Sequence, residues 1–414
     1  MRKEAKLGVP DIGVLGAVIV LLIAGMLLVF DASYAKMGDA KWAHFDIWYM
    51  VKRQLIFAAA GLGLMFWAMR LRFSSFIKWT APLLLISIAL LVAVMVPGIG
   101  RKVNGACRWI PLGPLNLQPS EIAKVAIVMY LAGIFAKRKM LVRRISGNWA
   151  APGMVVAVMA GLIFIEPDLG TAITIIATCF IMLYAAGAKK RHLLALATAG
   201  CGLAGLAVLF EPYRLQRIWV WLNPWKDPYG DGYQVIHSLL ALGTGGLTGV
   251  GLCEGREKLY IPAASTDFII ATLGEEAGLI GCVLLLGAFL FLTYRGLDVA
   301  RRSKSTYGNL LAVGLSSIIG MQAVINIAVV SASIPATGVP MPFISYGGSS
   351  LISMLVAAGL LLSVSRQVNV ELEERELYEN SIDGRGHRRS HISRNKRGSG
   401  SSRNRSGYRT TIRR

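Results

Sequence analysis

Long apolar runs separated by short polar segments follow one another along most of this chain. A transmembrane helix needs about 20 mainly apolar residues, and ten runs are close to that length or exceed it. They lie near residues 11–31, 54–70, 79–97, 119–137, 149–166, 168–187, 192–210, 267–294, 308–331 and 343–365. We therefore predict an all-α fold, a polytopic integral membrane protein with about ten transmembrane helices within residues 11–366.

One polar segment is much longer than the others and separates the seventh run from the eighth. It spans residues 211–266 and is rich in Trp, Tyr, Pro and Gly, with acidic and basic residues in balance. A structureless loop of this length is unusual unless it is functional, and Trp and Tyr favour the headgroup level of a bilayer. We expect a large extracytoplasmic loop that partly lies on the outer leaflet.

The distribution of positive charge predicts the orientation. Lys and Arg are enriched in short cytoplasmic loops. With residues 1–10 placed inside, the inner loops carry fifteen Lys and Arg, whereas the short outer loops carry seven. Both termini are therefore predicted to be cytoplasmic.

Composition excludes an ordinary soluble domain, because 54% of the residues are hydrophobic and only 16% are charged. The net charge of +21 is concentrated at one end, since residues 385–414 hold eleven Lys and Arg and no acid. We interpret residues 367–414 as a cytoplasmic, largely disordered basic tail that is attracted to anionic lipid. No folded module accompanies this tail, so nucleic-acid binding is not expected.

Asp267 ends the long polar loop at the point where the eighth apolar run begins. A carboxylate at the mouth of a membrane helix is energetically costly, which makes it a functional candidate. The simpler alternative is that Asp267 caps the N-terminus of its helix, because Asp before an apolar run is a helix-start signal. The local sequence leaves both interpretations open.

Polar residues also occur at the outer ends of several other apolar runs. Glu121 and Lys124 are three residues apart, which places them on one helical face where they can form an ion pair. The segments 166–171 (EPDLGT) and 337–350 (TGVPMPFISYGGSS) add further polar groups at the same predicted level. Because such groups are rare in lipid, we expect them to line a hydrophilic cavity that is open to the outer face.

Six segments in order make the chain resemble the SEDS family (shape, elongation, division and sporulation), whose FtsW, RodA and SpoVE members polymerise cell-wall glycan. They are GACRWI, LQPSEIAK, EPDLGTA, NPWKDPYGDGYQ, STDFIIATLGEE and PFISYGGSS, and the likeness covers about residues 11–366. Gln234 after GDGY and the LGPLNLQPSE segment are more similar to FtsW or SpoVE than to RodA. This likeness does not decide the cellular role, and division, elongation and sporulation all stay open.

The resemblance implies an FtsW-like peptidoglycan glycosyltransferase that polymerises lipid II by an inverting transfer. It implies that Asp267 is the essential acid, and we expect this residue to act as the general base. The residues that we expect to bind substrate are Arg53, Trp109, Gln118, Glu121, Lys124, Asp168, Arg214, Arg217 and Ser345. It further implies a class B penicillin-binding protein transpeptidase and other divisome proteins as partners, at the division septum of a bacterial plasma membrane.

One departure from the family pattern concerns the residues before Asp267. Many relatives read P-E-x-H-T-D, whereas this chain has Ala263 and Ser265 at the Glu and His positions. We interpret these two positions as accessory. Positive charge for the leaving pyrophosphate is expected from Lys124, Arg53, Arg214 and Arg217, and a divalent cation (Mg or Mn) is a further possibility. The sequence shows no dedicated metal cage.

Two other classes of function fit the same broad features. A lipid II flippase would need charged groups facing both leaflets, whereas the inner halves of the predicted helices look largely apolar. A divisome scaffold without activity would not need Asp267 at all. The polar loop on the outer side favours the enzyme.

Overall fold

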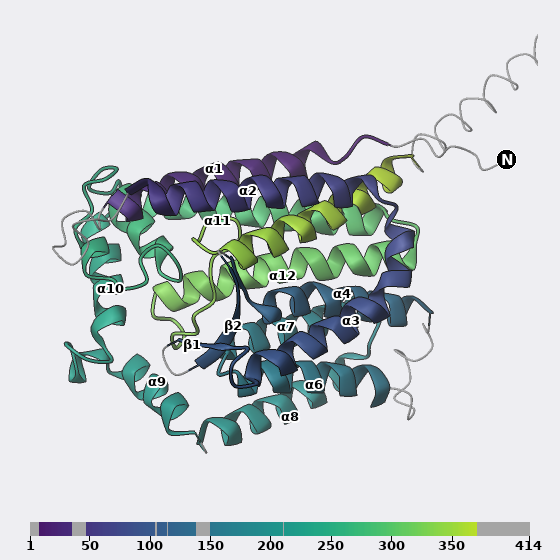
Figure 1. Ribbon diagram of the computed structural model, residues 1–414, viewed down its shortest axis with the longest axis horizontal. Coiled ribbons are helices and arrows are strands. Elements are labelled where there is room, and N and C mark those ends of the chain that lie inside the picture. The colour runs from purple at the N-terminus through teal and green to yellow at the C-terminus, as the bar shows by residue number, and fades with distance from the viewer. Residues whose placement is uncertain are drawn as a thin grey trace, which may run out of the picture.

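The computed structural model describes residues 8–34, 47–103, 106–113, 115–137, 150–209 and 211–370, most of which are helical (Figure 1). Several sequence predictions fall outside these described residues. They concern residues 1–7, the loop charges Lys36, Lys41, Arg138, Lys139, Arg143 and Arg144, and the basic tail from residue 371 onward.

Each of the ten predicted apolar runs falls on a helix in the described part of the chain. These helices are α1 (Ile12–Tyr34), α2 (Ile47–Arg70), α3 (Phe73–Met95), α4 (Pro119–Lys137), α6 (Ala150–Ile165), α7 (Leu169–Ala185), α8 (Lys190–Leu209), α11 (Ile269–Arg302), α12 (Thr306–Val330) and a final helix, Gly348–Val370. Among the described residues, six helices are long and apolar enough to cross a membrane: α1, most of α3, α4, α11, α12 and the final helix. The chain is therefore a multi-helix membrane protein, and ten crossings stays a prediction.

A small antiparallel sheet precedes α4 and is an exception to the all-α prediction. It consists of β1 (Arg101–Val103), β2 (Ala106–Leu112) and β3 (Leu115–Leu117), in the order β1-β2-β3. Strands this short in a polar loop do not show a clear alternation of apolar and polar residues, so the sequence pattern did not predict them. The sheet matters for the site because β2 carries Arg108 and Trp109.

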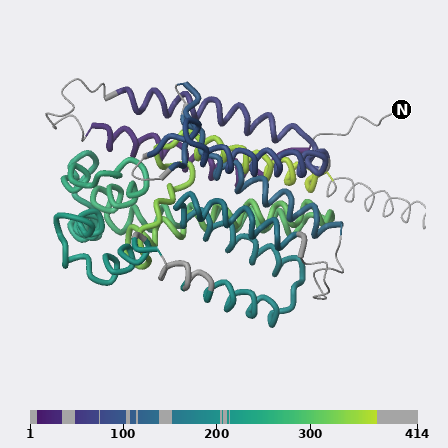
Figure 2. The backbone as a smooth tube through the Cα atoms, turned by 60° about the horizontal axis from the view of Figure 1, so that its bottom comes forward, coloured from purple at the N-terminus to yellow at the C-terminus, as the bar shows by residue number. Residues whose placement is uncertain are grey.

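The long segment 211–266 is largely structured. It contains α9 (Pro212–Leu222), a 3-10 turn η4 (Pro224–Lys226), α10 (Tyr233–Gly245) and a second 3-10 turn η5 (Glu257–Leu259). Figure 1 and the turned view in Figure 2 both place the teal residues of α9 and α10 at one end of the helix bundle. This arrangement separates the segment from the apolar middle of the bundle.

A glycine-rich part of this segment docks into a break in α11. Gly278 has a φ of 62°, which is outside the helical region. The Val250 amide donates to the Glu275 main-chain oxygen (3.0 Å), and the Leu279 amide donates to the Gly246 oxygen (3.0 Å). A Cβ atom at Gly278 would lie 2.4 Å from the Gly249 nitrogen, so only glycine fits this contact.

A buried ion cluster attaches the same segment to two transmembrane helices. Lys258 Nζ lies 2.5 Å from Asp31 Oδ1 of α1 and also pairs with Glu276 of α11. The neighbouring Glu275 accepts a 2.6 Å hydrogen bond from the Arg256 amide. Glu275 and Glu276, which follow Asp267 by eight and nine residues, therefore hold the loop and do not face the predicted cavity.

The centre of the bundle is α12, which packs against α4, α7 and α11. Most of its residues are buried, including the polar side chains Gln322 and Asn326. The two described ends of the chain lie together at the end opposite α9 and α10 (Figure 1). Arg366 Nε donates to the Gly8 oxygen at 2.8 Å and fixes this contact.

Candidate active site

A cavity of about 710 Å³ surrounds Asp267 at the α9 end of the bundle. Its walls come from β2, α9, the segment before α11 and the segment before the final helix. Among the lining residues are Arg108, Trp109, Gln118, Arg214, Arg217, Gln234, Thr266, Asp267, Gly338, Tyr346 and Ser350. We call this space the Asp267 cavity.

Asp267 does not cap the helix that follows it. The N-cap residue of α11 is Phe268, and no side chain forms a capping hydrogen bond there. The Asp267 side chain is instead half-buried and lines the cavity. The capping interpretation is therefore wrong, and the cost of placing this carboxylate here needs another explanation.

Three hydrogen bonds fix the main chain around Asp267. The Asn326 side-chain amide on α12 donates to the Asp267 oxygen at 2.8 Å. The Ser345 hydroxyl donates to the Thr266 oxygen at 2.5 Å, and the Tyr346 amide donates to the Ser265 oxygen at 2.8 Å. The carboxylate is thus carried by a short segment that is attached both to the central helix and to the PFISYGG segment.

The surroundings of Asp267 favour the protonated form of its carboxyl group. Burial is the largest cause, the negative charge of Asp168 adds to it, and the charges of Arg108 and Arg217 oppose it. The net effect raises the pKa of Asp267 to about 6. A carboxylate in this range is deprotonated at neutral pH and is still basic enough to accept a proton from a reacting hydroxyl.

Three arginines line the Asp267 cavity, and main-chain oxygens hold each of them in place. Arg108 Nε donates to the Glu166 oxygen at 3.0 Å. Arg214 donates to the Phe164 oxygen at 2.9 Å and stacks over the ring of the same residue, 3.6 Å from its centroid. Arg217 donates to the Ala336 oxygen. These contacts direct positive charge into the cavity, which suits it to a phosphate group.

Asp168 lies behind the cavity wall and is buried. It caps α7 by accepting from the Thr171 amide (3.2 Å), and it also accepts from the Gln118 side chain (3.3 Å). Gln118 lines the cavity, so Asp168 orients a lining residue and acts on Asp267 through its charge.

Lys124 is placed away from the Asp267 cavity. Its side chain is 1% exposed, and its ammonium group bonds to Glu121 (2.9 Å) and to Gln322 of α12 (2.8 Å). The predicted pair of Glu121 and Lys124 is therefore present, but Lys124 supports the helices. The Gln322 amide in turn donates to the Pro340 oxygen (2.8 Å), in the segment that lines the cavity.

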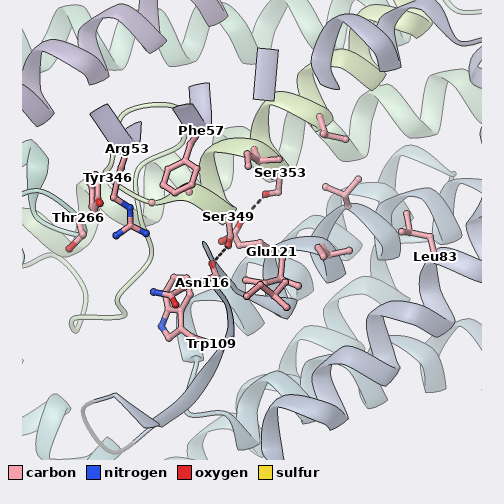
Figure 3. A pocket seen from close by; sticks show the side chains of 18 residues that line it. Arg53, Phe57, Leu83, Trp109, Asn116, Glu121, Thr266, Tyr346, Ser349 and Ser353 are labelled. Atoms are coloured by element: carbon pink, nitrogen blue, oxygen red, sulfur yellow. Dashed lines mark hydrogen bonds between the residues drawn. The ribbon is translucent and has the colours of Figure 1, made fainter. Parts of the chain in front are cut away.

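A second, apolar cavity of about 460 Å³ adjoins the first (Figure 3). We call it the apolar groove. Its walls come from α2, α3, β2, α4 and the final helix, and they include Arg53, Phe57, Leu83, Ile122, Val125, Ile352 and Val356. The two spaces share Trp109, Thr266, Tyr346 and Gly347. Glu121 lies at the edge of the apolar groove, where its carboxylate accepts a 2.8 Å hydrogen bond from the Ser353 hydroxyl.

The structure thus divides the predicted substrate-binding residues into three groups. Trp109, Gln118, Arg214 and Arg217 line the Asp267 cavity, and Trp109 is shared with the apolar groove, where Arg53 and Glu121 lie. Lys124, Asp168 and Ser345 are buried behind these surfaces.

Several residues of the site were not among the predicted ones, and four of them shape it most directly. Arg108 and Tyr346 line the Asp267 cavity, and Gln322 and Asn326 hold its walls from α12. Arg108 adjoins Trp109 and Tyr346 adjoins Ser345 in the sequence, so neighbouring positions carried a signal. Gln322 and Asn326 carried a weaker one, namely two amides four residues apart in an apolar run.

The described residues show no preformed metal site. No group of three or more His, Cys, Asp or Glu side chains among them is arranged to hold a metal ion. A divalent cation at this site stays a prediction, and it would need ligands from the substrate.

Comparison with known proteins gives a consistent result. Residues 13–370 match the FtsW/RodA/SpoVE family, described as "Cell cycle protein". The chain is 41% identical over 366 residues to the "Probable peptidoglycan glycosyltransferase FtsW" of Trichlorobacter lovleyi, covering 88% of this chain and 95% of the relative. It is 42% identical over 363 residues to "Stage V sporulation protein E" of Bacillus subtilis, covering 86% and 97%.

Two solved structures have a similar fold. One belongs to work on "Structural coordination of polymerization and crosslinking by a peptidoglycan synthase complex", with a TM-score of 0.72 at 29% identity over 87% of this chain and 98% of the other. The other is the rod shape determining protein RodA of Thermus thermophilus, with a TM-score of 0.63 at 29% identity over 86% and 97%.

Proposed function

The chain belongs to the FtsW/RodA/SpoVE (SEDS) family, and we propose that it is a peptidoglycan glycosyltransferase that polymerises lipid II with Asp267 as general base. The observation that carries this proposal is the junction of two unlike spaces at Asp267. An arginine-lined cavity suits the sugars and pyrophosphate of a lipid-linked substrate, and the adjoining apolar groove suits its polyprenyl chain.

The proposed reaction joins two lipid-linked disaccharides. The Asp267 carboxylate takes the proton from the 4-hydroxyl of the acceptor sugar, and that oxygen attacks the anomeric carbon of the donor. The bond from this carbon to the pyrophosphate oxygen breaks, and the configuration inverts. General-base catalysis of this kind is worth about 10²–10⁴-fold in rate.

The leaving pyrophosphate develops negative charge as its bond to the sugar breaks. Arg108, Arg214 and Arg217 are held by main-chain oxygens before the substrate arrives, so they stabilise this charge without first reorganising. Arg53 and Phe57 both line the apolar groove. The charge of Arg53 is therefore suited to the lipid side of the same pyrophosphate. Lys124 is assigned a supporting role in place of direct contact.

The arrangement of the described ends supports the predicted topology. Residues 8 and 366 lie in contact, and α9 and α10 lie at the opposite end of the bundle. An even number of crossings places both ends on one side, and the bias of Lys and Arg makes that side the cytoplasm. The Asp267 cavity would then face outward, in a membrane protein with ten transmembrane helices.

The partner and the cellular role are inferred from relatives. One similar structure comes from a complex that coordinates polymerisation with crosslinking. We therefore assign a class B penicillin-binding protein as the transpeptidase partner, together with other divisome proteins at the septum. RodA-type elongation and SpoVE-type sporulation are the alternatives, since a sporulation protein is among the similar sequences.

The decisive experiment is polymerisation of labelled lipid II by the purified chain, with and without its transpeptidase. Wild-type protein should give glycan polymer, and Asp267→Asn should give none, because the amide keeps the shape but cannot accept the proton. Polymer from the Asp267→Asn protein would refute the role of Asp267. Transport of lipid II by that variant in liposomes, without polymerisation by wild type, would indicate a flippase.

A further inference from the structure

Helix α9 has cavities on both of its sides. Arg214 and Arg217 face the Asp267 cavity. On the other side of α9, a further space of about 570 Å³ lies between this helix and the segment 223–232 that follows it. Its lining includes Gln216, Trp219, Val220, Asn223, Lys226, Asp227 and Asp231. We call this space the outer groove.

A small cavity of about 190 Å³ lies between the two spaces around α9. It shares Arg217 and Gln234 with the Asp267 cavity. It shares Gln216, Val220 and Asp231 with the outer groove. The three spaces are therefore neighbours along α9, with Asp267 lining the first and Trp219 lining the last.

The chemistry of the lining changes along this series. The Asp267 cavity has three arginines beside Glu211 and Asp267, whereas the outer groove has two aspartates, an asparagine, a glutamine and one lysine. Asp227 accepts from the Gly230 amide at 3.1 Å, and the Gln216 amide donates to Asp231, so both carboxylates are held in position. An acidic lining is unsuited to pyrophosphate, but carboxylate and amide groups match the hydroxyl and N-acetyl groups of sugars.

An aromatic wall completes the outer groove. The Trp219 side chain is 64% exposed even though it lines a cavity. A large flat ring of this kind offers apolar contact to the face of a pyranose, while the polar groups around it fix the orientation of the sugar. The combination distinguishes the outer groove from the apolar groove, which has few polar atoms to offer a saccharide.

We infer that the outer groove binds the growing glycan strand, at sugars beyond the one that reacts at Asp267. This inference rests on the proposed polymerase function. A strand that is held at both the Asp267 cavity and the outer groove stays on the enzyme between additions, because its second contact is intramolecular once the first is made. The outer groove would thus set the length of the product.

The test compares two exposed tryptophans of the same segment. Trp219 lines the outer groove, whereas Trp225 is 59% exposed and lines none of the three spaces. Trp219→Ala should shorten the mean strand length by about two- to tenfold, as expected for loss of one aromatic contact. The initial rate of lipid II consumption should change by less than about twofold, because the arginines and Asp267 are untouched. Trp225→Ala should match wild type in both measurements.

Two further variants distinguish loss of glycan binding from loss of folding or of membrane association. Trp219→Phe should restore long strands, since it keeps an aromatic wall. Asn223→Ala should shorten them without removing any apolar contact with lipid. Equal strand lengths in wild type and Trp219→Ala, or equal shortening by Trp225→Ala, would overturn the inference while leaving the polymerase assignment intact.

A binding assay separates this inference from the function on which it rests. Asp267→Asn protein, which should make no polymer, is mixed with a lipid-free tetrasaccharide of the glycan repeat, and binding is followed by calorimetry. The Asp267→Asn protein should bind this probe, and the Asp267→Asn, Trp219→Ala double variant should bind it about two- to tenfold more weakly. Equal binding by both proteins would overturn the outer-groove assignment even if wild type made no polymer. If Trp219→Ala instead lost its stimulation by the transpeptidase at unchanged strand length, the outer groove would be a partner contact. That result would also overturn the inference that it binds glycan.

Discussion

The side-chain amide of Asn326 donates a 2.8 Å hydrogen bond to the main-chain oxygen of Asp267 and a 2.7 Å bond to that of Val339. Asn326 is buried in the central helix α12. One side chain therefore joins the segment that carries the carboxylate to the segment that closes the Asp267 cavity.

Asn326→Ala should lower the maximal polymerisation rate by about 10- to 100-fold with little change in KM, since each buried hydrogen bond lost costs about 1–3 kcal/mol and the carboxylate loses its fixed position. Rates at varied lipid II concentration would measure this split. Asn309→Ala is the matched control, because Asn309 on the same helix donates a 2.7 Å bond to the Ala300 oxygen, away from the site. Equal losses of rate in the two variants would indicate general destabilisation.

The pH dependence of polymerisation should follow the ionisation of Asp267. Activity should rise with pH through about 6, because the base must lose its proton before it can act. Arg217→Gln removes a charge that lowers the pKa of Asp267, so the rising limb should move to higher pH. Asp168→Asn removes a charge that raises this pKa, and Asn still caps α7, so the limb should move to lower pH. Shifts in the same direction for both variants would contradict the assignment of Asp267 as the titrating group.

Glu166 should tolerate replacement by glutamine. Burial and the charge of Asp168 raise the pKa of Glu166 to about 8, and its carboxyl oxygens have no hydrogen-bond partner among the described residues. The side chain is therefore protonated at neutral pH, and Glu166→Gln should polymerise within about twofold of wild type.

The same shift has a consequence for stability. A folded-state pKa above the unfolded value means that wild type loses stability as pH rises from about 4.5 to about 8. Glu166→Gln should lack that slope, which thermal unfolding in detergent at pH 5 and pH 8 would reveal. Parallel losses of Tm in both proteins would argue against a neutral Glu166.

The apolar groove should distinguish substrates by chain length. Val356→Phe narrows the groove between α4 and the final helix. It should raise KM for full-length lipid II by about tenfold, because overpacking typically costs 1–3 kcal/mol. A substrate with a short lipid chain should be little affected, and kinetics with the two substrates would test this. An equal increase in KM for both would place the polyprenyl chain elsewhere.

The buried cluster around Lys258 should contribute strongly to stability. Lys258→Ala leaves the carboxylates of Asp31 and Glu276 buried without their cation, which typically costs about 3–5 kcal/mol. A clear fall in Tm is expected, whereas Lys304→Ala, at an exposed position near the end of α11, should have almost no effect. A small change for Lys258→Ala would mean that the two acids find other partners.

Much of the helical architecture was predictable from the sequence, because apolar runs of sufficient length have no other stable form in lipid. Every predicted run coincides with a helix, and the polar segments between them mark where the helices end. The position of Asp267 beside a cavity was also predictable, since a carboxylate beside a membrane helix is costly. The short strands before α4 and the two helices within residues 211–266 were not, because their amphipathic pattern is brief.

Tertiary structure alone decided what each polar residue does. Lys124 and Arg217 are both basic residues within helices, yet Lys124 is buried between Glu121 and Gln322 whereas Arg217 lines the Asp267 cavity. The sequence shows that such groups need partners but not which partners meet, because these contacts join α4 to α12, and α9 to the segment after α12, across long separations in the chain. The placement of the Asp267 cavity beside the two grooves follows from the same packing, and no single segment contains it.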